Sequence, residues 1–131
     1  MSTKRETKLL DRVSQDLDKH NYQILNTYKD ITRFDLLAFK NNCLFAIEVK
    51  SRPIETFDIV TGSTINSSTL SNLIRDKPEY QDKEVIPVLV SGSVVLGETK
   101  EFGSRMGVIV TETSDLAESL ENSICYRKRK S

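Results

Sequence analysis

Apolar and polar positions recur along the chain with two different periods, and these periods divide it into predicted helices and strands. Leu10, Val13 and Leu17 recur at helical spacing, which predicts a first helix over residues 3–20. Residues 22–28 then alternate between apolar and polar as a strand does, before a predicted turn at Lys29-Asp30. The chain therefore begins with an amphipathic helix followed by a strand.

The clearest pattern lies in residues 33–52, RFDLLAFKNNCLFAIEVKSR, where two apolar runs flank Asn41-Asn42. Asparagine tolerates the left-handed conformation that a two-residue hairpin turn requires. Residues 33–39 and 43–50 are therefore predicted to pair as antiparallel strands, with Lys40 facing Cys43. Both faces of this pair are apolar, which is typical of central strands covered on both sides.

Weaker patterns after the hairpin predict an alternation of helices and strands. Pro53 should end the second hairpin strand, and the polar residues of 54–68 predict a loop, which is either a substrate-contacting lid or a plain connector. The remaining predicted elements are a helix from residue 68 to before Pro78, a strand over 85–90, a helix around 98–105, a strand over 106–110 and a last helix capped by Ser114-Asp115. Pro87 indicates that the strand over 85–90 has either one free hydrogen-bonding side or a distortion. The predicted fold class is α/β, with a mixed central β-sheet flanked by helices.

Length and composition indicate one domain, residues 1–131, of a protein expected in the cytoplasm. The chain has no run of eighteen apolar residues and no signal-peptide pattern, so no membrane association is expected. Nineteen basic and nineteen acidic residues cancel, which argues against a general DNA-coating protein. Cys43 and Cys125 lack metal-ligand spacing and are expected to be reduced thiols.

The hairpin also brings charged residues together at one end. Continuing the pairing away from the turn places Asp35 opposite Glu48, and Lys50 follows on the same sheet face. Two carboxylates about 5 Å apart repel each other unless a cation lies between them. The spacing therefore predicts a cation site, although Glu48 and Lys50 are also compatible with an ordinary surface ion pair at the end of a strand.

Asp35, a gap of twelve residues and then Glu48-Val49-Lys50 resemble the D…(D/E)xK signature of the PD-(D/E)xK nucleases, and most closely archaeal Holliday-junction resolvase-like endonucleases. This resemblance covers about the first sixty residues. It implies a restriction-endonuclease-like αβββαβ core, here with a C-terminal αβα extension. It also implies Mg²⁺ or Mn²⁺ held by Asp35, Glu48 and the Val49 carbonyl, with Lys50 beside the attacking water. The expected function is that of a metal-dependent DNA endonuclease.

A further acid of the first helix belongs to this expectation. Glu6 has two interpretations: it caps the helix by bonding the backbone of Thr3, or it joins Asp35, Glu48 and Lys50 as a catalytic residue, as the first-helix acid of the resembled family does. Asp11 is the next candidate for that acid. His20, the only histidine, ends the predicted helix at a position that favours a cation without catalysis.

DNA is the expected partner, and three basic residues are candidate phosphate contacts. Arg52 follows the hairpin directly, whereas Arg127 and Lys128 belong to a basic run at the C-terminus. A solvent-exposed strand end explains Arg52 equally well, and a solvated chain end is the alternative for Arg127 and Lys128. The sequence contains no helix-turn-helix or zinc module, which favours recognition of DNA structure over base sequence. A homodimer would present two sites to two strands. The alternatives are a catalytically silent nucleic-acid-binding or scaffold protein with this fold, and an unrelated α/β protein.

Overall fold

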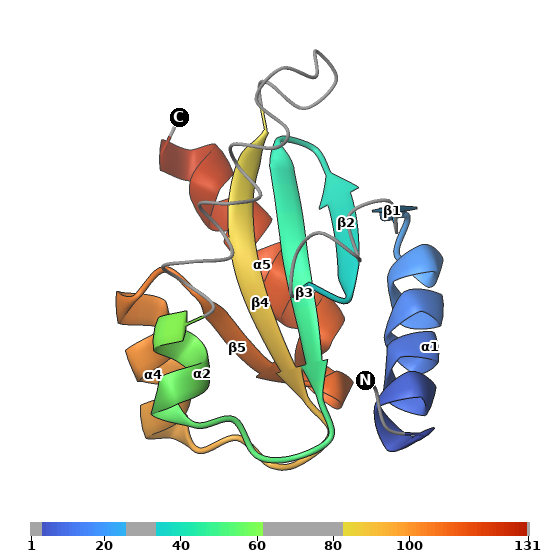
Figure 1. Ribbon diagram of the computed structural model, residues 1–131. Coiled ribbons are helices and arrows are strands. Elements are labelled where there is room, and N and C mark those ends of the chain that lie inside the picture. Colours follow the sequence, from blue (N-terminus) through green and yellow to red (C-terminus); the bar gives the residue numbers. More distant parts are fainter. Residues whose placement is uncertain (1–3, 26–33, 62–82, 131) are drawn as a thin grey trace.

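The computed structural model describes residues 4–25, 34–61 and 83–130 of the chain (Figure 1). Its elements, in chain order, are α1 (Lys4–Lys19), β1 (Gln23–Leu25), β2 (Leu36–Lys40), β3 (Cys43–Lys50), α2 (Thr56–Thr61), β4 (Glu84–Ser91), α4 (Gly97–Arg105), β5 (Ile109–Glu112), a 3-10 turn η3 (Thr113–Asp115) and α5 (Leu116–Lys130). The prediction of a mixed α/β fold is confirmed. The predicted Thr3 cap, the Lys29-Asp30 turn and the helix ending before Pro78 lie outside the described residues.

The five described strands form one mixed sheet in the order β1-β2-β3-β4-β5. Strand β2 is antiparallel to both β1 and β3, whereas β4 runs parallel to both β3 and β5. The mixed sheet predicted from the sequence is thus present, with β3 at its centre. Because β3, β4 and β5 are parallel, their carboxyl ends lie at the same end of the sheet.

The register of the central hairpin is the predicted one. Lys40 pairs with Cys43 and Leu36 with Ile47, and Asn41 adopts the left-handed conformation with φ of 56°. Asparagine tolerates this conformation better than most residues, so the two-residue turn forms without glycine. Asn21 likewise ends α1 with a φ of 68°.

Helices cover both faces of the sheet, with α1 and α5 on one face and α2 and α4 on the other (Figure 1). Alternate side chains of β3 serve the two layers. Phe45 and Ile47 pack against Val13 and Leu17 of α1, whereas Leu44 and Ala46 face the opposite side. This explains why the sequence of β3 is apolar almost throughout rather than alternating.

Pro87 lies in the interior strand β4 without breaking its ladder. The Glu84 amide donates to Asn42 O, directly before β3, and the Gly92 amide donates to Lys50 O of β3, so alternation turns the nitrogen of residue 87 toward β5. Strand β5 begins only opposite Val88, one residue further along. The missing N–H of Pro87 therefore costs no ladder hydrogen bond. Of the two alternatives that the sequence allowed, the structure shows the free hydrogen-bonding side.

Four predicted boundaries are wrong. Residues 56–61 are helical, not part of a loop, because Asp58 caps the start of α2 and Ile59 is buried beneath it. Strand β2 begins at residue 36, not 33, and β5 begins at residue 109, because Met106 and Gly107 end α4, with φ of 77° at Gly107. The basic run at the C-terminus continues α5 to Lys130 and is not a separate tail. None of the helices in the described ranges combines the length and apolar character needed to cross a bilayer.

Close packing of α4 on β5 depends on Gly103. A methyl group at this buried position would collide with Val110 Cγ2 and would lie 2.9 Å from the Val108 carbonyl oxygen. Because that oxygen belongs to the backbone, the helix would have to move. We expect Gly103→Ala to lower the free energy of unfolding by about 1–3 kcal/mol, measured by urea denaturation.

Gly97→Ala, in the first turn of the same helix, is the matched control. A methyl group there meets nothing within 4 Å, so stability should be unchanged or rise by a few tenths of a kcal/mol. Unchanged or increased stability in Gly103→Ala, as expected for Gly97→Ala, would contradict the packing role of Gly103.

Candidate functional site

The charged residues singled out by the sequence gather at the carboxyl end of β3. Glu48 and Lys50 share the sheet face of Leu44 and Ala46, on the side of α2 and α4. Asp35 lies immediately before β2, beside this end of β3. The structure therefore brings together three of the four predicted catalytic residues.

Glu48 and Lys50 form an ion pair of 2.8 Å between Glu48 Oε1 and Lys50 Nζ. Their side chains are only 14% and 22% exposed, so this pair is more enclosed than a solvated surface pair. Removing one partner from a shielded pair leaves the other charge poorly compensated, which costs more than losing an exposed pair. The Glu48–Lys50 pair is therefore a partly shielded ion pair at the end of a strand, which is compatible both with a cation site and with an ion pair that is only structural.

Asp35 approaches β3 through its side chain. The last paired residues of the hairpin are Leu36 and Ile47, one step short of the predicted Asp35–Glu48 pair. The Asp35 amide donates to Ile47 O at 2.9 Å, and Asp35 Oδ2 accepts the Val49 amide at 2.8 Å. The carboxylate thus replaces a main-chain acceptor, and this substitution is why β2 starts after Asp35.

The Val49 backbone faces the same edge as the Asp35 carboxylate. Lys50 O accepts the amide of Gly92, directly after β4, at 3.0 Å, so the N–H and C=O of Val49 point the other way, toward β2. Val49 lies between Glu48 and Lys50 in the chain. The Asp35 carboxylate and the Val49 carbonyl are therefore on one edge of β3, next to the Glu48–Lys50 pair.

Arg52 is held in an ion pair that the sequence did not reveal. Its guanidinium donates to both carboxylate oxygens of Asp58, each at 2.8 Å, and to Pro53 O at 3.0 Å. Asp58 is buried and also accepts the Glu55 amide at 2.9 Å, which caps α2. Arg52, predicted to contact phosphate, thus joins the end of β3 to α2, with its side chain 48% exposed.

The charges at this end of β3 alternate in sign. Hydrogen bonding to Arg52 holds the pKa of Asp58 below its usual value, against the effect of burial, and the Lys50 charge acts in the same direction. Hydrogen bonding to Asp58 raises the pKa of Arg52, to which the Glu48 charge also contributes. Three carboxylates and two cations therefore share one small region.

Ser91 is a second residue that sequence inspection missed. Its buried hydroxyl donates to Arg52 O and accepts the Ser93 amide, both at 2.9 Å. This joins the chain leaving β3 to the chain leaving β4. A serine ending an apolar strand carries no sequence signal of that role, whereas the spacing of Glu55 and Asp58 is a weak helix-start signal.

The remaining predicted residues lie elsewhere. Glu6 is in the first turn of α1, and Asp11 is exposed further along that helix. Arg127 and Lys128 are in the last turns of α5, which Figure 1 shows ending at the opposite end of the sheet from the carboxyl end of β3. The structure therefore separates these two basic residues from Asp35, Glu48 and Lys50.

Within residues 4–25, 34–61 and 83–130, no group of three or more His, Cys, Asp or Glu side chains is arranged to hold a metal ion. The donors at the end of β3 are instead two carboxylates and one carbonyl. An all-oxygen set of this size suits Mg²⁺ or Mn²⁺, since Mg²⁺ keeps several of its waters when bound to protein. His20 bonds Asp16 O near the end of α1, and buried Cys43 begins β3 at its other end, so neither contributes nitrogen or sulfur.

Comparison of the chain with protein-family models, curated proteins and solved structures finds no match.

The Asp58 ion pair generates a prediction about acid stability. Because the pKa of Asp58 is lowered in the folded state, its stabilising contribution is complete above the unfolded pKa of about 3.9 and is lost as pH falls through the folded value. Asp58→Asn should cost about 1–3 kcal/mol at pH 7 and should lose less stability than the parent on acidification. Urea denaturation between pH 7 and pH 3 measures both effects.

Glu55→Gln, at the exposed start of the same helix, is the control. The Glu55 amide bonds Asp58 through the backbone, so this change should preserve both stability and its pH dependence. Retention of the parent's acid sensitivity by Asp58→Asn would assign that sensitivity to other carboxylates.

Proposed function

We propose that the protein is a metal-dependent DNA endonuclease that hydrolyses phosphodiester bonds. The observation that supports this most directly is the position of the Asp35 carboxylate, bonded to the Val49 amide between Glu48 and Lys50. This arrangement matches the order of acids and lysine in the D…(D/E)xK signature. Three antiparallel strands followed by a parallel one are also what a restriction-endonuclease-like core requires.

Asp35, Glu48 and the Val49 carbonyl would hold Mg²⁺ or Mn²⁺. Bound there, the metal would lower the pKa of a water ligand and neutralise charge on the phosphate. The Val49 amide fixes one oxygen of Asp35, so this ligand is oriented before any ion binds. Preorganised ligands of this kind reduce the reorganisation needed to reach the transition state.

Lys50 would interact first with the Glu48 carboxylate and then with the attacking water or the phosphate. Without a metal, its ammonium neutralises Glu48 at 2.8 Å. Once the Glu48 charge is shared with a cation, Lys50 is available to orient the attacking water or to stabilise negative charge on the phosphate. The Arg52–Asp58 pair, fixed by the Glu55 amide, would hold this end of β3 rigid and would position Lys50 without contacting substrate.

The second candidate function is a catalytically silent nucleic-acid-binding or scaffold protein with the same fold. It is favoured by the Glu48–Lys50 ion pair, which already balances one carboxylate without a metal. Binding of DNA and Mg²⁺ without cleavage of any DNA form would support it.

The activity itself is tested with DNA of several structures. Linear duplex, nicked duplex, single-stranded and four-way-junction DNA are incubated with the protein in Mg²⁺, in Mn²⁺ and in EDTA. We expect metal-dependent cleavage, with preference set by DNA structure rather than by sequence. Absence of cleavage in every combination would reject the endonuclease proposal.

Asp35→Asn tests the negative charge of Asp35 separately from its hydrogen bond to the Val49 amide. The asparagine oxygen can still accept the Val49 amide, so the fold should keep its stability, whereas loss of the negative charge should weaken Mg²⁺ binding and cleavage together. Glu48→Gln should have the same effect on metal and cleavage. Calorimetric titration of Mg²⁺ and thermal denaturation measure the two properties.

Lys50→Ala should act differently from both carboxylate variants. Cleavage should fall by about a hundredfold or more, as expected for loss of one transition-state contact. Mg²⁺ binding should be retained or strengthened, because the ammonium no longer competes for Glu48. Lys83→Ala is the control, since Lys83 bonds Asn41 O at the turn end of the hairpin. Cleavage by Lys50→Ala at the parent rate would show that this lysine has no chemical role.

A further inference from the structure

A line of basic and polar side chains follows the exposed face of α1. Lys8, Arg12, Gln15 and Lys19 recur every three or four residues, so they lie on one side of the helix, and all four are exposed. Eleven residues separate Lys8 from Lys19, which corresponds to roughly 16 Å along the helix axis. This distance equals the axial rise of about five nucleotides in one strand of a duplex.

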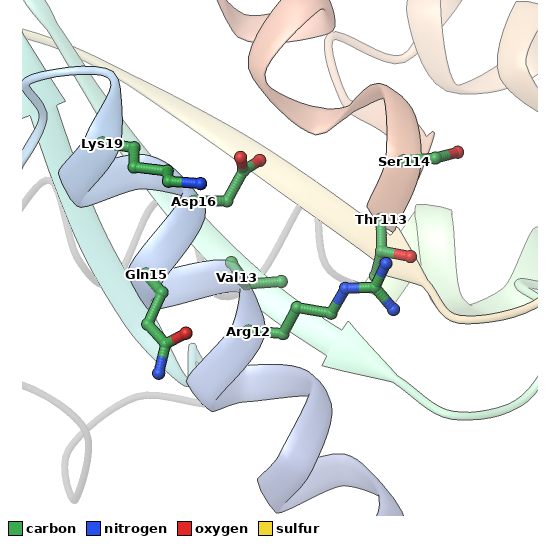
Figure 2. Close-up of a pocket in the computed structure, with 7 residues that line it drawn as sticks. All are labelled: Arg12, Val13, Gln15, Asp16, Lys19, Thr113 and Ser114. Atoms are coloured by element: carbon green, nitrogen blue, oxygen red, sulfur yellow. The ribbon is translucent and has the colours of Figure 1, made fainter.

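Two cavities lie along this face, and Arg12 lines both. The smaller one, about 210 Å³, is lined by Lys8, Leu9, Arg12, Ser51 and Gly92. The larger one, about 460 Å³, is lined by Arg12, Val13, Gln15, Asp16, Lys19, Thr113 and Ser114 (Figure 2). We call the two cavities together the α1 groove.

The α1 groove begins at the carboxyl end of β3 on the α1 face of the sheet, whereas Glu48 and Lys50 lie at the same end on the α2 and α4 face. Ser51 follows Lys50 in the chain, and the Gly92 amide donates to Lys50 O at 3.0 Å. Leu9 of α1 packs against Gly92 so closely that a methyl group there would come within 2.9 Å of Leu9 Cδ1. These contacts hold the Lys8 and Arg12 end of the groove next to the chain that leaves β3.

The larger cavity is lined mainly by groups that donate hydrogen bonds. Figure 2 shows the Arg12 guanidinium reaching toward Thr113, with Gln15 and Lys19 on the α1 side of the cavity and Ser114 on the other side. Two cations outnumber the one carboxylate, Asp16, whose Oδ1 lies 3.7 Å from His20 Nδ1. Guanidinium, ammonium, amide and hydroxyl groups are the side chains that contact phosphate oxygens in protein–nucleic-acid complexes.

We infer that the α1 groove binds the sugar-phosphate backbone of the nucleic-acid strand that enters the candidate active site, with Arg12 and Lys19 as the principal phosphate contacts. This inference rests on the proposed endonuclease function, which sets the path of the bound strand from the end of β3 toward Thr113. Among the residues that the structure describes, no aromatic side chain lines either cavity, and these residues would therefore not stack bases there. Recognition along this surface would therefore depend on the backbone and be independent of base sequence.

The distribution of charge favours a local contact with a nucleic-acid backbone over a general attraction of the whole protein to polyanions. The chain carries nineteen cations and nineteen anions, so its net charge provides no overall pull. The attraction must instead come from a local surface matched in length to a few phosphates. Such contacts release counterions, and each one adds about 0.9 to the slope of log affinity against log salt for duplex DNA.

The test is equilibrium binding of a fluorescein-labelled duplex oligonucleotide in EDTA, where cleavage does not occur, over a series of salt concentrations. Arg12→Ala and Lys19→Ala should each weaken binding, by about the same factor for unrelated base sequences, and should each reduce the salt slope by about 1. Arg12→Lys should restore most of the slope, because it restores the charge. Lys83→Ala should leave both affinity and slope at the parent values, since Lys83 lies at the other end of the hairpin.

Thermal denaturation of each variant distinguishes a loss of binding from a loss of folding. Because Arg12 and Lys19 are exposed, their replacement should preserve the melting temperature. Parent affinity and slope in both alanine variants would overturn the inference even if Mg²⁺-dependent cleavage were observed. Reduced slopes without any cleavage would retain the groove and reject the endonuclease proposal instead. Binding of anionic phosphatidylserine vesicles but not of the oligonucleotide would overturn the inference in favour of a membrane surface.

Discussion

The register of the β2–β3 hairpin is the constraint on which the rest of the structure depends. A two-residue turn at Asn41-Asn42 pairs Lys40 with Cys43, and every later pair follows from it. Because side chains alternate between faces, a slip of one residue would move Phe45 and Ile47 out of the layer they share with α1. The same slip would move Glu48 and Lys50 to that layer. Core packing and the placement of the charged residues are therefore set by one turn.

Side-chain hydrogen bonds take over from the sheet where the hairpin ends. Asp35 accepts the Val49 amide in place of a backbone carbonyl, and Ser91 joins the chains leaving β3 and β4. Arg52 and Asp58 then attach the start of α2. Backbone groups in a shielded region must find partners, and here polar side chains supply them. The charged side chains at this end of the sheet are therefore fixed by hydrogen bonds to β3, β4 and α2. Because these bonds hold them in place, their geometry can persist when one charged side chain pairs with a different group.

Sequence periodicity was sufficient for the elements whose apolar pattern is long. The first helix and the hairpin register followed from spacing, because each depends on local geometry and on burial of one face. It was insufficient for α2, a six-residue helix with one buried apolar side chain that is fixed by Asp58. The role of Arg52 was also missed, since its partner is an acid six residues away and no periodic pattern connects the two. Short-range spacing predicted the neighbours of Lys50, whereas contacts across elements had to be seen in the structure.

Zero net charge conceals a segregation of charge that is relevant to a polyanionic substrate. At the end of β3, three carboxylates outnumber Lys50 and Arg52, an excess that favours a divalent cation over a phosphate. On α1, in contrast, Arg12 and Lys19 outnumber Asp16 in a cavity of about 460 Å³. The Lys50–Gly92 hydrogen bond and the Leu9 contact place these two regions at the same end of the sheet, on its two opposite faces. If a strand binds along α1 as inferred above, Arg12 and Lys19 would attract its phosphates, and the carboxylates at the end of β3 would repel them unless a cation neutralises that charge. Cation binding by Asp35 and Glu48 and the placement of the strand would then depend on each other through electrostatics.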